Sequence, residues 1–179
     1  LCTIGMFDEI MDSGVVSLKI EGRGRAPEYV DEVIGCYREA IESVKGGEYN
    51  RDKVKNWNER LGTVYNRKMS EGFYRGQAFR YWSEGAHSQA TQKKELVGTV
   101  EHYYPKVGVA EIRVHASDLK ETDKCMITGK TTGLIRFVPE GMIVDEMPSD
   151  HAQQGSLITT KVPDKVRKND KFYKFVKVV

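Results

Sequence analysis

Near residue 95 the apolar residues of this 179-residue chain change lastingly from helical to strand spacing, and that change limits the folds open to it. Before the polar stretch at residues 83–94, most periodic segments have the three- and four-residue spacing of amphipathic helices. Beyond Glu95 apolar and polar residues alternate, as in strands. Because a helix-period segment does not fold as a strand, the sequence predicts an α+β protein in which helices come first and strands follow.

Three segments of the first half have helical periodicity: Phe7 to Ser13, residues 27–44, and a segment from Arg51 onward. The middle helix is the best defined, with Pro27 at its first position and two glycines after its end. Its predicted apolar stripe is Val30, Val33, Ile34, Tyr37, Ile41 and Val44. Cys36 lies beside this stripe, and we expect a buried, inert thiol there.

Between the first two helices, residues 16–21 alternate as a strand does, which places Ser17, Lys19 and Glu21 on one face. A strand flanked by helices is typical of a parallel sheet covered by helices. Charged side chains at the carboxyl end of such a strand are costly unless they serve a site, so Lys19 and Glu21 are candidate functional residues. The alternative is a neutralising ion pair on a solvated edge strand.

The stretch from Tyr65 to Trp82 crowds aromatic residues and arginines between glycines, without a regular period. Residues 51–82 hold eight Lys and Arg against three Asp and Glu. Interleaved aromatic rings and guanidinium groups are typical of surfaces that bind single-stranded RNA. Arg67, Arg75 and Arg80 are therefore candidate nucleic-acid contacts. A loop that packs aromatic residues at a domain junction would have the same composition.

The last part of the chain contains six strand-like runs separated by turn residues. They are Val97 to Tyr103, Val109 to His115, Lys124 to Gly129, Leu134 to Val138, Ser156 to Lys161 and Lys171 to Val176. Six short strands in a small domain predict a closed antiparallel β-barrel, since closure removes the sheet edges.

The C-terminal end of the chain is basic. Residues 161–179 hold seven Lys and Arg against two Asp and Glu, so one edge of the predicted barrel should be positive. Such a stripe can neutralise phosphates, which makes Arg167 and Lys168 candidate nucleic-acid contacts. Lysines on an exposed terminal strand also protect its edge from pairing, and this alternative stays open.

Charge, cysteine content and apolar run lengths limit which other classes of protein this chain can belong to. A formal net charge of +2 is too small for the whole molecule to attract nucleic acid or a membrane surface. Three cysteines, Cys2, Cys36 and Cys125, are far apart and odd in number, which predicts a reducing, cytoplasmic setting rather than a disulfide framework. No apolar run is long enough for a membrane span. The chain does not begin with methionine, and we expect it to be a piece of a longer protein.

The run SLKIEGRGRAPEYVDEVIGCYREAI, preceded by LCTIGMFDEIMDSGV, resembles the last strand and helices of the catalytic barrel in the collagenase-like peptidase U32 family. The resemblance implies that residues 1–47 end an α/β (TIM-like) barrel, with Lys19, Glu21 and Arg23 at its mouth as catalytic residues. It implies a helical and basic-aromatic connector at residues 48–94. Residues 95–179 would then form the family's C-terminal β-barrel, which is similar to the second domain of elongation factor Tu.

The Leu1-Cys2 pair matches the position of the fourth cysteine ligand of a 4Fe–4S cluster in several members of this family. Cys2 is thus the candidate metal and cofactor ligand. The other three ligands would precede residue 1, because Cys36 and Cys125 have the wrong spacing. This chain alone is not expected to hold the cluster.

The resemblance implies three functions. The first is an enzyme that hydroxylates an RNA base, with tRNA as the partner and an iron–sulfur cluster in the full-length protein. The second is a collagenase-like peptidase, although the sequence shows no nucleophile–histidine pairing and no HExxH motif. The third is a non-enzymatic β-barrel module that binds RNA or protein. On any of these, we expect this segment alone to be inactive as an enzyme, and no membrane partner.

Overall fold

The computed structural model describes residues 1–76 and 87–178. It divides into two compact units, a helical unit that spans Leu1–Thr91 and a sheet unit that spans Gln92–Lys177. No helix in the described part of the chain combines the length and apolar character that a membrane crossing requires.

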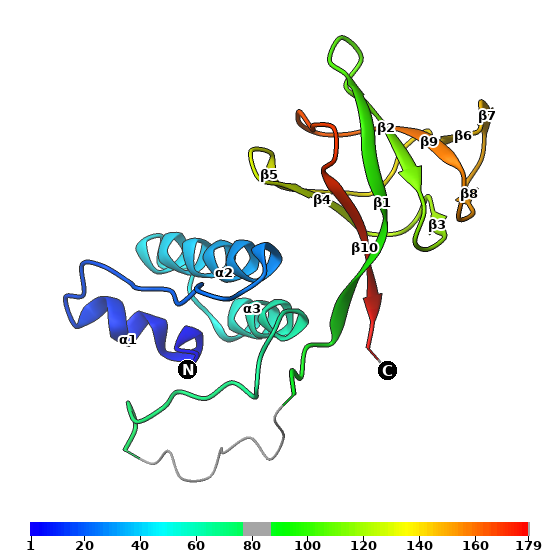
Figure 1. Cartoon of the computed structure of the whole chain (residues 1–179). Helices are drawn as coiled ribbons and strands as arrows, with labels where there is room; N and C mark the ends of the chain where they lie inside the picture. The colour runs from blue at the N-terminus through cyan, green and yellow to red at the C-terminus, as the bar shows by residue number, and fades with distance from the viewer. Residues whose placement is uncertain (77–86, 179) are drawn as a thin grey trace. The chain divides into compact units, whose positions relative to one another are not determined.

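The helical unit consists of a short 3₁₀ turn, Ile4–Met6, and three α-helices, α1 (Phe7–Asp12), α2 (Pro27–Lys45) and α3 (Arg51–Thr63) (Figure 1). All three helices were predicted, and their observed bounds confirm the expected positions. Local signals explain where α3 begins, since the Asn50 side chain accepts hydrogen bonds from the backbone of Asp52 and Lys53 at 3.1 and 3.0 Å.

The buried face of α2 is rotated from the predicted stripe. Ile34 is 40% exposed, whereas Cys36 and Ala40 are fully buried. The small side chains allow α3 to approach closely, and the Cys36 thiol lies 4.0 Å from the backbone oxygen of Trp57. Burial raises the pKa of Cys36 to about 12, which agrees with the expected inert thiol. The buried core of the unit consists of Ile4, Phe7, Val33, Cys36, Ala40, Trp57 and Leu61.

The strand predicted at residues 16–21 is not present. Residues 15–22 run between α1 and α2 without regular secondary structure, and the Val16 side chain is fully exposed. A strand needs a neighbouring strand to pair its backbone groups, and the described part of the helical unit contains none. The prediction was therefore wrong for this chain by itself, although the alternating pattern of side chains is real.

Two carboxylates of α2 hold one arginine of α3. Arg60 donates from Nε to Glu32 at 2.8 Å and from Nη1 to Glu39 at 2.6 Å, and Trp57 Nε1 donates to the same Glu39 oxygen at 2.9 Å. The hydrogen bond from Arg60 lowers the pKa of Glu39 below its usual value. These contacts tie α2 to α3 beside their shared core.

Replacing Glu39 by glutamine should therefore make the helical unit less stable near neutral pH, by about 0.5 kcal/mol for a pair this exposed. The pKa of Glu39 is lower in the folded state than its ordinary value of 4.5, so its contribution is present above that pH and disappears as pH falls through the folded value. Urea unfolding followed by tryptophan fluorescence at pH 7 and at pH 3 measures the difference in unfolding free energy. Glu59→Gln, an exposed carboxylate of α3, is the control. An unchanged pH dependence in Glu39→Gln would contradict the assignment.

The sheet unit contains all six predicted strands and four further strands of two residues each. The predicted ones appear as β1 (Gln92–Tyr104), β2 (Val109–Val114), β4 (Cys125–Gly129), β5 (Gly133–Phe137), β9 (Leu157–Lys161) and β10 (Lys171–Lys177). The short ones are β3 (Leu119–Lys120), β6 (Ile143–Val144), β7 (Met147–Pro148) and β8 (His151–Ala152).

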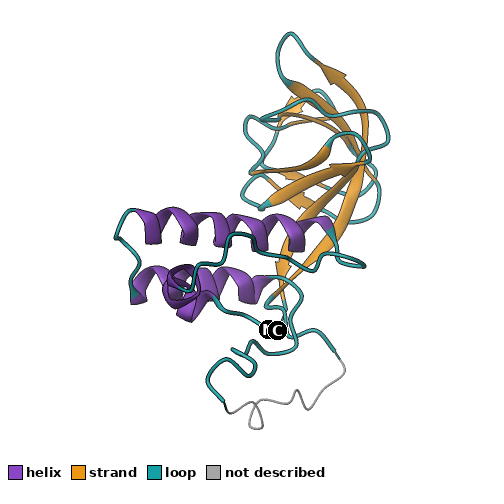
Figure 2. Ribbon diagram, turned by 90° about the vertical axis from the view of Figure 1, so that its left-hand side faces the viewer, coloured by secondary structure: helices purple, strands orange, loops and turns teal. Residues whose placement is uncertain are grey.

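Eight strands form one antiparallel sheet in the order β5-β4-β10-β1-β2-β9-β6-β7, and β3 pairs with β8. The strands are labelled in Figure 1 and drawn in orange in Figure 2. The predicted closure is not observed, because β5 and β7 end the sheet and do not pair with each other. In the segment that connects β5 to β6, backbone groups bond to side chains instead of a strand: Met142 N donates to Glu121 and Glu140 N donates to Thr160. Pro139 in this segment has no N–H to offer a ladder.

The longest-range pairing in the sheet joins β1 to β10. Its first residue, Gln92, lies opposite Lys177, the last residue of β10, so the chain enters and leaves the sheet unit at adjacent positions. The register of β1 shifts between Leu96 and Gly98, where the strand bulges. Gly98 is buried there against the backbone of β2.

Candidate functional site: a basic and aromatic pocket

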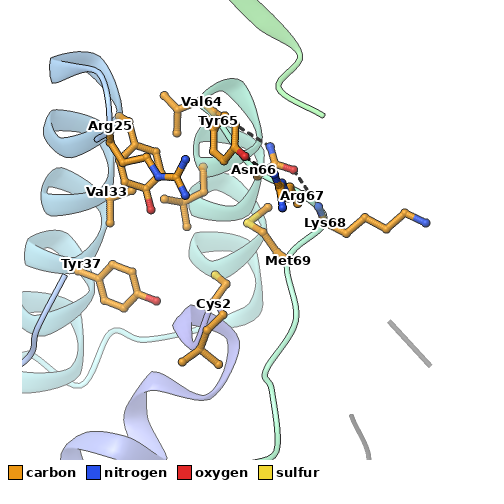
Figure 3. A pocket seen from close by; sticks show the side chains of 13 residues that line it. Cys2, Arg25, Val33, Tyr37, Val64, Tyr65, Asn66, Arg67, Lys68 and Met69 are labelled. Carbon is orange, nitrogen blue, oxygen red and sulfur yellow. Dashed lines mark hydrogen bonds between the residues drawn. The ribbon is translucent and has the colours of Figure 1, made fainter. Parts of the chain in front are cut away.

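A pocket of about 230 Å³ lies between the start of the chain, α2 and the segment that follows α3 (Figure 3). Its volume is below the range of about 300–1,000 Å³ that drug-sized ligands occupy, so it suits a single ring or one anionic group. The residues that line it are Leu1, Cys2, Arg25, Tyr29, Val33, Tyr37, Leu61, Val64, Tyr65, Asn66, Arg67, Lys68 and Met69.

Two arginines and a tyrosine form the basic side of the pocket. The guanidinium of Arg25 lies 4.1 Å from the ring centre of Tyr65 and 5.8 Å from that of Tyr29. Arg67 donates from Nε to the Tyr65 hydroxyl at 2.9 Å. The neighbouring guanidinium groups, Arg25 above all, lower the pKa of Tyr65. Stacked rings and fixed guanidinium groups are the features with which proteins bind flat and anionic ligands.

Asn66 fixes the segment that carries Arg67. Its side-chain amide donates to the backbone oxygen of Val64 at 3.0 Å, and its side-chain oxygen accepts from the backbone of Lys68 at 3.3 Å. Lys68 adopts a left-handed backbone with φ of 68°. As Figure 3 shows, the Lys68 side chain extends away from the cavity, so its charge lies at the rim.

The other end of the pocket carries a thiol and a phenol. Cys2 is held by a backbone hydrogen bond to Ser70 at 2.8 Å, and its thiol lies 4.0 Å from the Asn58 side-chain oxygen. Tyr37 accepts a hydrogen bond from the Thr3 backbone at 3.0 Å, and burial raises its pKa. The thiol of Cys2 and the hydroxyl of Tyr37 both point into the space between α2 and Met69 (Figure 3).

Of the residues predicted from the sequence, Cys2 and Arg67 line this pocket. Lys19, Glu21 and Arg23 do not. All three are exposed in the segment before α2, and the backbone N–H of Arg23 donates to the Glu21 carboxylate at 2.7 Å. In this chain Lys19 and Glu21 therefore lie on a surface rather than in a cavity.

The other candidate nucleic-acid contacts are dispersed. Arg75 is paired with Glu9 at 2.5 Å and with Glu71 at 3.2 Å, which offsets its charge. Arg80 lies outside the described residues.

Arg167 and Lys168 are exposed on the sheet unit, before β10. The Arg167 side chain donates to Thr132 at 3.1 Å. Of the four candidate cations that the structure describes, Arg67 lines the pocket.

The described residues do not make up a metal site. Among them no three His, Cys, Asp or Glu side chains gather in a position to hold a metal ion. Cys36 and Cys125 are buried in separate cores, and burial raises the pKa of each thiol to about 12. Within the described part of the chain, Cys2 therefore does not combine with other cysteines into a set of four thiolate ligands.

Sequence reasoning missed the aromatic half of the pocket. Arg25 and Tyr65 are forty positions apart in the chain, and no local period connects them. Tyr29 and Tyr37 were assigned only to the helix before the structure placed them at the cavity. One signal was available, since Tyr65 begins the basic and aromatic stretch that the composition had marked.

Residues 1–84 match the model of peptidase family U32. Over 177 residues the chain is 40% identical to a collagenase of Porphyromonas gingivalis, a match that takes in 99% of this chain and 43% of that protein. It is 37% identical over 178 residues to an uncharacterized protease of Methanocaldococcus jannaschii, covering 97% of this chain and 42% of that protein. The chain belongs to peptidase family U32, and it spans less than half the length of these relatives.

Two further similarities cover parts of the chain. A tRNA hydroxylation protein of Bacillus subtilis is 38% identical over 77 residues, which are 41% of this chain and 25% of that protein. The crystal structure of the C-terminal domain of a U32 peptidase from Geobacillus thermoleovorans matches 45% of this chain and 91% of that domain, with a TM-score of 0.42 and 20% identity.

Proposed function

We propose that this chain belongs to an enzyme that hydroxylates a base of RNA, with tRNA as the substrate class, when it is part of a protein as long as its relatives. The observation that carries the proposal is the pocket, which combines fixed guanidinium groups, two tyrosine rings beside Arg25 and the Cys2 thiol. The sequence similarity to a tRNA hydroxylation protein also supports the proposal.

Each part of the site has a role in this proposal. Arg25 and Arg67 bind an anionic group of the substrate, and the rings of Tyr29 and Tyr65 hold a flat group against them. Cys2 contributes one thiolate to an iron–sulfur cluster whose other ligands this chain does not supply. Such a cluster supplies electron transfer when bound.

The segment before α2 has a separate role in the longer enzyme. Its alternating pattern makes it a strand once neighbouring strands pair with it, and Lys19, Glu21 and Arg23 then lie at the mouth of a barrel. Lys19 and Arg23 bind an anionic group there, and Glu21 orients them or transfers protons.

A collagenase-like peptidase is the second candidate, and the 40% identity along the whole chain to a collagenase favours it. The contacts among the described residues give no further support for a peptidase. One hydroxyl–histidine pair is present, Thr99 Oγ1 with His115 Nε2 at 2.9 Å, on an exposed part of the sheet unit. No described carboxylate contacts this imidazole to orient it, as a hydrolytic triad requires. A non-enzymatic binding module is the third candidate.

In a protein extended to the length of its relatives, Lys19→Ala and Glu21→Ala should each lower the hydroxylation rate by about 100-fold or more, the usual contribution of a positioned acid or base. Both side chains are exposed in this chain, so unfolding free energies should change by less than about 0.5 kcal/mol. Mass spectrometry of nucleosides from treated tRNA measures the hydroxylation rate. Thermal unfolding measures the change in stability.

Lys55→Ala, an exposed lysine of α3, is the matched control and should retain full activity. A large loss of stability with activity retained would instead favour the alternative in which Lys19 and Glu21 form a structural ion pair. Cleavage of a collagen peptide by a protein that leaves tRNA unmodified would establish the peptidase.

A further inference from the structure

The outer face of the sheet around β10 carries a second basic and aromatic surface, separate from the pocket. On β10 the side chains alternate, and Phe172 is fully buried in the core. Tyr173 and Phe175 share the opposite face with Lys171, and both rings are half-buried. Two residues along a strand are about 6.6 Å apart, so the two rings present neighbouring flat surfaces.

Cations from the flanking strands stand beside both rings. Lys94 of β1 lies opposite Phe175, with its ammonium 5.1 Å from the Tyr173 ring centre. Arg136 of β5 places its guanidinium 5.3 Å from the Phe175 ring centre. The backbone of Phe175 donates to Lys124, which is exposed at the start of β4. We call Lys94, Lys124, Arg136, Lys171, Tyr173 and Phe175 the β10 face.

The strand register brings these residues together. It places Met126 opposite both Tyr173 and Arg136, and Thr128 opposite Lys171. The one acidic residue in the first part of β1, Glu95, lies on the other side of that strand, where it pairs with Lys174 at 3.3 Å. Lys94, Lys124, Arg136 and Lys171 therefore lie around the two rings on one face of the sheet.

We infer that the β10 face binds single-stranded RNA, with two bases stacked on Tyr173 and Phe175 and the phosphates bound by the four cations. A sheet that carries neighbouring aromatic rings framed by cations suits this ligand, because every base can stack while the backbone is negative. The inference extends the proposed function, on which it rests for the identity of the RNA as substrate. It adds a second contact, distant in sequence from the pocket, that holds the strand of RNA.

The test uses the whole 179-residue chain and a fluorescein-labelled, unstructured RNA 12-mer, with binding followed by anisotropy. Tyr173→Leu and Phe175→Leu should each weaken binding about ten-fold, since each removes one stacking surface. Leucine keeps apolar cover over the buried Met126, so melting temperatures should change little. Lys124→Ala should weaken binding of all sequences alike and reduce the slope of log affinity against log salt by about one.

Tyr104→Ala is the matched control, because this tyrosine of the same unit lies beside Glu111 and away from the β10 face. Its affinity for RNA should equal that of the unchanged chain. Equal affinities for the two leucine variants and the unchanged chain would overturn the inference. The inference would also be overturned if the unchanged chain bound oligoglutamate as tightly as RNA and the leucine variants lost that binding. The β10 face would then be a site for acidic protein.

The two proposals fail in different ways. If Arg25→Gln and Arg67→Gln abolish RNA binding while both leucine variants retain it, the β10 face is not the binding surface and the proposed function stands. If the leucine variants lose RNA binding but the longer protein does not hydroxylate tRNA, the inference about binding stands and the proposed function is wrong.

Discussion

Replacing Gly98 by alanine should destabilise the sheet unit by about 3 kcal/mol, the upper range for overpacking in a well-packed core. A Cβ at this position would lie 2.0 Å from the backbone oxygen of Arg113 and 2.9 Å from its carbonyl carbon. These atoms belong to β2, which is paired on both sides and cannot move away without breaking ladders to β1 and β9. For a unit of this size the melting temperature should fall by about 12–24 °C.

Far-UV circular dichroism in the strand region follows this unfolding. The fluorescence of Trp57 and Trp82, which both precede the sheet unit in the chain, should not change with it. Gly133→Ala is the control. Gly133 has φ of 75°, but a Cβ added to it would meet no atom within 4 Å, so this change should cost about 1–2 kcal/mol from backbone conformation alone. A Gly98→Ala chain that melts within about 2 °C of the unchanged one would show that the bulge opens without cost.

Replacing Cys2 by serine should remove the iron from a longer U32 protein that carries the other three cysteine ligands. The expected change is from about four irons per chain to none, with loss of the broad visible absorbance, because a 4Fe–4S cluster loses stability with one of its thiolates. Anaerobic purification followed by iron and sulfide analysis measures this without reference to any activity. The 179-residue chain should be colourless under the same treatment.

Cys36→Ala is the matched control for this experiment. The Cys36 thiol is fully buried in the helical core and alanine is close to it in size, so the iron content should be retained. Full-length protein that contains no iron before any substitution, and that still cleaves peptides, would contradict the cluster and favour the peptidase.

Much of the fold follows from local sequence signals. Pro27 and Asn50 mark the starts of α2 and α3, and alternation over five or more residues marks each of the six long strands. Two features depend on contacts that no local pattern encodes. The strands β3, β6, β7 and β8 are two residues long and show no period, and the gap between β5 and β7 depends on side chains such as Glu121 and Thr160.

The candidate site was predictable in composition and not in geometry. Crowded aromatic and basic residues marked the neighbourhood of Arg67, yet the partner of that segment is Arg25, which a turn before α2 brings to Tyr65. The strand at residues 16–21 shows the opposite case, since its pattern is clear and its pairing partners are missing from the described residues. Periodicity reports which face of a segment is apolar, but hydrogen bonding to a second segment decides whether a strand forms.

The pairing of Gln92 with Lys177 has a consequence for how this protein family can vary. The first and last residues of such a domain lie side by side. It can therefore be inserted into another chain, or removed from it, while the two flanking residues of that chain stay about one strand spacing apart. The residues that hold its core lie wholly between those two points. The sheet unit thus meets the geometric requirement for a module that is gained or lost as a whole, because both of its ends lie at one point on paired strands.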